Sequence, residues 1–247
     1  MAATLTALLC AHFVADFLLQ PAGLIRNKRK PLVLLGHAII VLATAVLFLG
    51  GFPLLPLALL LGTHIVMDAV KVYLLPDRFW AFLADQGVHL MVILGLAMAF
   101  PNIMAAGWWA DILPPGWGEA YMAVLVLLTG LVASLGAGAV LIRKATAGLM
   151  DEIRAPIEGL SNGGLYIGCL ERGLVLLLIL MGQPSGVGFL VAAKSILRFG
   201  DVTNPAERKT AEYIIIGTFM SFGWGLLVAV LTAAGVRFWM PGLVPVI

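Results

Sequence analysis

Long apolar segments dominate the sequence and limit the folds that the chain can adopt. Several of them approach the roughly 20 residues that a helix needs to cross a bilayer. Backbone groups in lipid must be hydrogen-bonded within the protein, so such segments predict membrane-spanning helices. The composition agrees, because 62% of the residues are hydrophobic and only 11% are charged, against about 25% in soluble domains. The sequence therefore predicts an all-α, polytopic transmembrane helix bundle without a sizeable soluble domain.

We expect about eight helices, joined mostly by short connections, so that neighbouring helices run antiparallel. Their expected ranges are 2–20, 31–50, 53–75, 78–100, 119–141, 163–182, 185–199 and 211–236. The seventh is short for a span, which favours a tilted, re-entrant or internally packed helix. The first lacks a basic region before its apolar run, which favours a retained helix over a signal peptide.

The basic residues predict how the helices are oriented. The basic residues near the helix ends lie in or beside the odd-numbered connections, four in 26–30 alone, whereas the connections 51–52, 101–118 and 183–184 carry none and only Arg237 falls on the far side. The positive-inside rule therefore places the odd connections in the cytoplasm and both termini on the non-cytoplasmic side.

One segment divides the chain into halves of different chemistry. Residues 101–118 contain three tryptophans and two adjacent prolines, which is typical of an interfacial segment. Before it, residues 1–100 form a four-helix half that holds every histidine. After it, residues 119–247 form a four-helix half with intramembrane Glu, Arg and Lys. We expect both halves to build one integral membrane unit.

Histidine and aspartate recur in the first half at a spacing of four residues, which puts both side chains on one helix face. The pairs are His12 with Asp16, His64 with Asp68 and, in reverse order, Asp85 with His89, while His37 stands alone. The helix directions place these groups at two adjacent depths of the cytoplasmic leaflet. The deeper layer holds His12, His64 and His89, and the shallower one holds Asp16, His37, Asp68 and Asp85.

A carboxylate at this depth costs several kcal/mol unless it is paired or bound to a cation. Imidazole and carboxylate ligands together suit Zn, Mn or Fe, so we predict an intramembrane divalent metal site with one metal or two. The expected ligands are His12, His37, His64, Asp68 and His89, and the expected catalytic residues are Asp16, Asp85 and Lys71.

Other interpretations of the same residues remain open. They are a structural network of His–Asp hydrogen bonds, axial ligation of haem by paired histidines, and a proton or ion pathway. Lys71 either pairs with Asp68, extends to the membrane interface or faces an anionic substrate.

The second half carries charged residues inside apolar segments. Glu171 and Arg172 lie near the middle of one segment, and Lys194 and Arg198 lie four residues apart in the next. One interpretation is charge pairing and membrane anchoring. The other is that Arg172, Lys194 and Arg198 bind an anion, such as a phosphate group, beside the metal layer.

Small residues recur every four positions at Gly130, Ser134 and Gly138. This pattern favours close helix packing and leaves a homodimer or a larger membrane complex open.

Several stretches carry a family resemblance. They are HFVADFLLQ, GH at 36–37, HIVMDAVK, DQGVHL, ERGLVLLLIL, GFLVAAKSILRFGD and EYIIIGTFMSFGWG. Together they resemble the domain-of-unknown-function 3307 family of bacterial inner-membrane proteins, which implies a multi-pass protein of that membrane and no established activity. The His and Asp pairs alone are similar to bacterial membrane-bound proteins predicted to be metal-dependent hydrolases.

The function that we expect first is a membrane-embedded, metal-dependent hydrolase of a phosphate-containing lipid or other amphiphile. The alternative is a non-catalytic membrane subunit or a transporter that uses the same residues for metal, haem or proton binding. Nucleic acid is not an expected partner, because the basic residues serve topology and form no basic face on a soluble domain.

Overall fold

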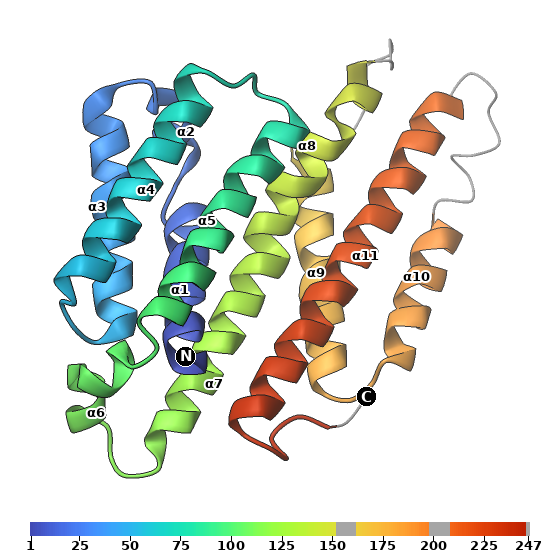
Figure 1. Cartoon of the computed structure of the whole chain (residues 1–247). Coiled ribbons are helices and arrows are strands. Elements are labelled where there is room, and N and C mark those ends of the chain that lie inside the picture. The colour runs from blue at the N-terminus through green and yellow to red at the C-terminus, as the bar shows by residue number, and fades with distance from the viewer. Residues whose placement is uncertain (152–161, 198–207, 246–247) are drawn as a thin grey trace. The chain divides into compact units, whose positions relative to one another are not determined.

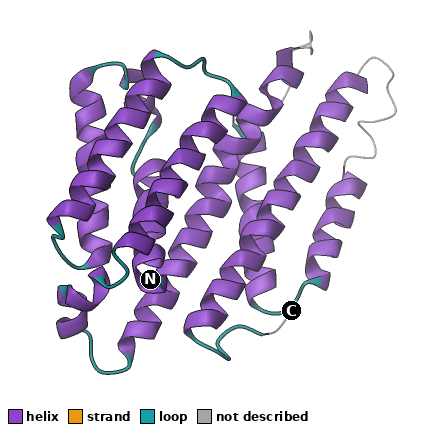
Figure 2. Ribbon diagram, viewed as in Figure 1, coloured by secondary structure: helices purple, strands orange, loops and turns teal. Residues whose placement is uncertain are grey.

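The structure is a computed structural model that describes residues 1–151, 162–197 and 208–245. Every regular element in this part of the chain is a helix, so the predicted all-α class is confirmed (Figures 1 and 2). Six helices are long and apolar enough to span a membrane, and Ala2–Leu18 and Ser185–Ile196 are shorter apolar helices. Contacts divide the chain into two compact units, Met1–Val132 and Ala133–Ile247.

The first unit contains the elements up to α7. They are α1 (Ala2–Phe13), η1 (Val14–Leu18), α2 (Ala22–Asn27), α3 (Pro31–Leu49), α4 (Leu54–Tyr73), α5 (Phe79–Ala99), η2 (Ile103–Ala106), α6 (Trp108–Ile112) and α7 (Trp117–Val132). The second unit contains η3 (Ala133–Ala137), α8 (Gly138–Asp151), α9 (Gly163–Leu180), α10 (Ser185–Leu197) and α11 (Arg208–Trp239).

Helix α1 lies at the centre of the first unit, where it packs against α3, α5 and α7 (Figure 1). The buried face of α1 and η1 carries Ala7, Cys10, Ala11 and Ala15. Such small side chains let helix backbones approach closely, which is the usual way of packing helices in lipid. The first His–Asp pair is thereby held in the middle of the unit.

The end of α1 widens into the π-helical turn η1, which the sequence pattern did not predict. There the backbone N–H of Leu19 donates to the carbonyl of Val14, five residues back, at 2.9 Å. Asp16 lies inside this turn. A π-helical turn shifts the residues within it out of the regular α-helical register, and such turns are frequent at functional sites.

All eight expected helical segments are present, with different ends. The fifth was expected to end at residue 141, but the helix continues through η3 and α8 to Asp151. Arg143 and Lys144 do not stop it, because both are good helix formers whose side chains can extend toward water. The seventh, α10, has 13 residues and a length of about 20 Å, which is shorter than a bilayer core. The side of the membrane on which each end lies stays a prediction.

The segment 101–118, predicted to be interfacial, folds into η2 and α6 and caps the end of α3. The indole N–H of Trp109 donates to the carbonyl of Leu47 at 2.7 Å, and the backbone N–H of Trp108 donates to that of Gly50 at 2.6 Å. These carbonyls are among those that a helix end leaves without partners. The N-terminal amine of Met1 also donates to the carbonyl of Pro101 at 2.8 Å, so α1 begins where α5 ends.

The cap around Gly50 gives a stability test. Gly50 has a left-handed backbone with φ of 71°, and a Cβ added there would overlap the Trp109 indole. We expect Gly50→Ala to lower the unfolding free energy by about 2 kcal/mol, through both backbone strain and displacement of the indole. Thermal unfolding in detergent would measure it. Gly36→Ala in the same helix is the control, because its Cβ would meet open space; equal melting temperatures for the two variants would contradict the role of this cap.

Candidate metal centre

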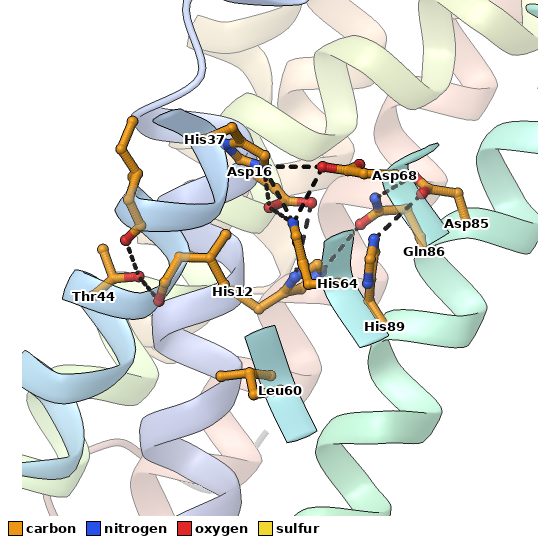
Figure 3. Close-up of polar contacts among 12 residues, drawn as sticks. His12, Asp16, His37, Thr44, Leu60, His64, Asp68, Asp85, Gln86 and His89 are labelled. Atoms are coloured by element: carbon orange, nitrogen blue, oxygen red, sulfur yellow. Dashed lines mark hydrogen bonds and ion pairs between the residues drawn. The ribbon is translucent and has the colours of Figure 1, made fainter. Parts of the chain in front are cut away.

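Seven histidine and aspartate side chains from α1–η1, α3, α4 and α5 meet inside the first unit (Figure 3). Six of them have at most 4% of their surface exposed, and the side chain of Asp16 has 7%. The four-residue spacing has the predicted effect, since each pair projects from one helix face into the same space. The members of the cluster are His12, Asp16, His37, His64, Asp68, Asp85 and His89.

Three of the imidazoles pack together in one layer. The rings of His64 and His89 stack with centroids 4.2 Å apart, and the ring of His12 lies 5.4 Å from that of His89. A small cavity of about 10 Å³ borders this layer and is lined by the three rings together with apolar side chains such as Leu60. That volume is about the space of one water molecule.

The fourth imidazole lies among the carboxylates. His37 Nε2 is 3.2 Å from His64 Nε2, 3.3 Å from Asp16 Oδ1 and 3.8 Å from Asp68 Oδ2. His64 Nε2 is in turn 3.8 Å from Asp16 Oδ1 and 3.5 Å from Asp68 Oδ2. The four atoms thus form two triangles that share the edge between the imidazoles.

These separations are the ones expected around a single ion. Ligand bonds of about 2.0–2.2 Å in a tetrahedral site place neighbouring ligand atoms roughly 3.3–3.6 Å apart. The sides of the two triangles, from 3.2 to 3.8 Å, fall close to this range. One ion could therefore take both imidazoles together with the carboxylate of Asp16 or that of Asp68.

The π-helical turn changes the geometry of the first pair. His12 Nδ1 lies 3.8 Å from Asp16 Oδ2, whereas Asp16 Oδ1 lies 3.3 Å from His37 Nε2. The other two pairs lie in regular α-helix, where the distance is 3.5 Å from His64 Nε2 to Asp68 Oδ2 and 3.3 Å from His89 Nε2 to Asp85 Oδ1. Asp16 is thus closer to His37 on the neighbouring helix α3 than to His12 on its own.

Two lysines neutralise two of the three aspartates. Lys28 Nζ lies 2.7 Å from Asp68 Oδ1, and Lys71 forms an ion pair with Asp85 Oδ2. Among the described residues, no lysine or arginine pairs with Asp16, whose ion-pair neighbours are histidines. With neutral imidazoles, the three carboxylates and the two lysines together carry one negative charge, which a proton or a cation must offset inside lipid.

Gln86 fixes the tautomer of His12. Its amide nitrogen donates to Asp85 Oδ2 at 3.0 Å, so its carbonyl oxygen faces His12 Nε2 at 3.1 Å. With this amide orientation His12 must donate from Nε2. The other ring nitrogen, Nδ1, then carries a lone pair and lies 3.8 Å from Asp16 Oδ2, so it can bind a cation or accept a proton beside that carboxylate.

Several buried polar atoms of the cluster lack a hydrogen-bond partner among the described residues. They are Asp16 Oδ1, His37 Nδ1, Asp85 Oδ1 and His89 Nε2. An unsatisfied buried polar group costs about 1–3 kcal/mol, more when it is charged. The two carboxylate oxygens carry lone pairs suited to a cation, so the donor set fits a bound metal ion.

The structure adds one residue that the sequence reasoning missed and changes the partner of another. Lys28 was counted only as a topological charge, but it is buried and reaches Asp68. For Lys71, pairing with Asp68 was one of three alternatives, and the structure shows it in contact with Asp85 instead. Lys28 lies in a connection, and its contact with Asp68 on α4 depends on tertiary structure. No local spacing in the sequence predicts this contact.

In the second unit, Arg172 is buried and holds the π-helical turn η3. Its guanidinium donates to the carbonyl of Ser134 at 2.6 Å, to that of Leu135 at 3.3 Å and to the hydroxyl of Ser221 at 3.0 Å. These bonds satisfy carbonyls of η3. A Cβ on Gly138 would collide with the same guanidinium, which confirms the close packing predicted there.

The other predicted anion ligands are paired or lie outside the described residues. Lys194 Nζ lies 2.7 Å from Glu171 Oε2, as expected from charge pairing, and Arg198 lies outside the described ranges. The anion-binding role of Arg172, Lys194 and Arg198 stays a prediction.

Comparison with known proteins supports the family resemblance for part of the chain. Residues 4–110 match the family model described as "Protein of unknown function (DUF3307)". The match contains the whole His/Asp cluster and covers less than half of the chain, so the stretches quoted from the second half lie outside it. No curated protein and no solved structure gives a significant match, and the likeness to predicted metal-dependent hydrolases stays a prediction.

The buried Lys28–Asp68 pair makes a stability prediction. Lys28→Met leaves the Asp68 carboxylate without its ammonium partner, so we expect a loss of about 3 kcal/mol of unfolding free energy in metal-free buffer. Adding Asp68→Asn should restore much of it. Thermal unfolding in detergent gives the comparison, with the exposed Lys30→Met as control. A double variant as unstable as Lys28→Met alone would show that the charge pair is not the cause.

Arg172 allows a structural role to be separated from anion binding. Arg172→Lys keeps the charge but cannot reproduce the several bonds of the guanidinium, so we expect a melting temperature lower by several degrees. The exposed Arg143→Lys is the control. Unchanged stability combined with lost binding of inorganic phosphate, measured by calorimetry, would instead favour the anion-binding role.

Proposed function

We propose that this multi-span membrane protein contains an intramembrane divalent metal centre and uses it to hydrolyse a phosphate-containing amphiphile. The observation that carries the proposal is the arrangement around His37 and His64, whose Nε2 atoms lie 3.2 Å apart and each lie 3.3–3.8 Å from an oxygen of Asp16 and one of Asp68. Asp16 Oδ1 has no hydrogen-bond partner among the described residues, and no lysine or arginine balances its charge. Both observations favour a cation at this position.

The donor set indicates which cofactor is suitable. Two imidazoles with carboxylates suit Zn, Mn or Fe. Haem is less suitable, because the stacked rings of His64 and His89 and a cavity of about 10 Å³ leave no space for a porphyrin. A divalent cation here would polarise a phosphoryl oxygen and acidify water.

The neighbouring residues have roles in this chemistry. His12 Nδ1, the free ring nitrogen left by the bond to Gln86, accepts the proton of the attacking water. Lys28 and Lys71 hold Asp68 and Asp85 in the ionised form. One divalent cation would change the net charge of the three carboxylates and two lysines from one negative to one positive unit. A positive site favours an anionic group over a neutral one.

A phosphate-containing amphiphile fits the position of the centre. The cluster is buried in the first unit, whose outer surface carries exposed apolar side chains, such as Leu32, Leu54 and Phe52. A substrate with an acyl or prenyl chain can approach such a surface from the lipid phase. Its phosphate group would then have to enter between helices, because the cavity of about 10 Å³ admits no more than a water molecule.

Full burial of the cluster favours a second candidate, a transporter that passes a divalent cation or a proton through the same residues. All seven members lie inside the first unit, and Lys71, with 27% of its side chain exposed, connects Asp85 to the surface. Intramembrane His and Asp groups of this kind are typical of ion pathways.

The first experiment is metal analysis of the protein purified in detergent. We expect close to one equivalent of Zn, Mn or Fe in the wild type, and a loss of at least about tenfold in occupancy in His37→Ala and His64→Ala. Thr44→Val in α3 is the matched control, because its hydroxyl bonds only to carbonyls of its own helix. A metal-free wild type after supplementation, or equal metal in all variants, would overturn the metal centre.

A second experiment separates hydrolysis from transport. Phosphate release from vesicles containing phosphatidic acid should depend on the metal and fall by at least about 100-fold in His64→Ala. Uptake of Mn²⁺ into proteoliposomes under a membrane potential, without phosphate release, would replace the hydrolase with the transporter.

A further inference from the structure

A second pair of buried donor atoms lies beside the first centre and is not used by it. His89 Nε2 lies 3.3 Å from Asp85 Oδ1, yet neither atom has a hydrogen-bond partner among the described residues. Asp85 has 1% of its surface exposed and His89 has 4%. Two buried polar atoms at this distance that form no hydrogen bond are suited to bind one cation jointly.

Asp68 supplies the third donor. One oxygen of Asp68, one of Asp85 and one nitrogen of His89 lie within 4.8 Å of one another. Asp68 also belongs to the first centre, where Oδ2 lies 3.5 Å from His64 Nε2. A carboxylate shared by two such groups is the arrangement found where two metal ions sit about 3.5–4 Å apart.

We propose that Asp85, His89 and the shared Asp68 form a second divalent-cation position, so that the centre is dinuclear. This inference rests on the proposed first metal position. Three protein ligands leave room on the ion for water or a phosphoryl oxygen. The second ion is therefore the one that meets the substrate, whereas the first is held more completely by protein.

Lys71 competes with the second ion. Its ammonium contacts Asp85 Oδ2 and so places a positive charge close to the position of that cation. The side chain is 27% exposed and lies near the end of α4, so it can turn toward the surface when the ion binds. The second ion should consequently bind more weakly than the first, and removal of Lys71 should strengthen it.

The inference can be tested by titrating the detergent-solubilised protein with Mn²⁺ and recording free Mn²⁺ and exchange coupling by electron paramagnetic resonance. The wild type should bind one Mn²⁺ tightly and a second more weakly, with a coupled spectrum when both are bound. Lys71→Met should tighten the second step at least about tenfold. His89→Ala should abolish the second step and keep the first. Thr63→Val, on α4 beside the cavity, should leave both unchanged.

The outcomes distinguish the two proposals. A single uncoupled Mn²⁺ in both wild type and Lys71→Met would overturn the second position and keep the first. Two coupled ions in His89→Ala would also overturn it. No bound Mn²⁺ in the wild type would remove the first position and the second together. Melting curves of each variant, compared with the wild type, exclude loss of folding as the cause of a lost step.

Discussion

The cost of holding three carboxylates in the interior of a membrane protein governs the first unit. An uncompensated charge at this depth costs several kcal/mol, so each aspartate needs a cationic partner. Lys28 and Lys71 serve Asp68 and Asp85, while Asp16 is left to the imidazoles. The three aspartates therefore differ. Lysines balance two of the charges, and the charge of Asp16 must be balanced by an exchangeable proton or cation.

Packing and backbone geometry place that third charge. The small face of α1 lets the helix sit between α3, α5 and α7, so its polar residues reach the partners on every side. The π-helical turn η1 then directs Asp16 toward His37 on α3. A second π-helical turn, η3, serves stability instead, since its carbonyls are bonded by the guanidinium of Arg172. A π-helical turn thus contributes to the polar cluster in one unit and binds a buried guanidinium in the other.

The sequence predicted the helices and the convergence of the cluster well, because both follow from periodicity and depth. Apolar length defines the spans, and helix direction predicts that His12, His64 and His89 share one layer, as their ring contacts show. The contacts that depend on tertiary structure were not predictable. Lys28 enters from a connection, Lys71 turns to α5 rather than pairing on α4, and neither π-helical turn has a signature in hydrophobic spacing.

The burial of Lys28 also bears on how fast the cluster can exchange its occupants. Its backbone belongs to the connection that follows α2, and its ammonium lies on Asp68 Oδ1 at 2.7 Å. In the proposed metal centre, an ion that bound both oxygens of Asp68 would have to displace this ammonium. Loading and release of that ion would then depend on the motion of Lys28, and loop motions take nanoseconds to microseconds. Tight binding and slow exchange of the ion would then both originate in the position of Lys28 on Asp68.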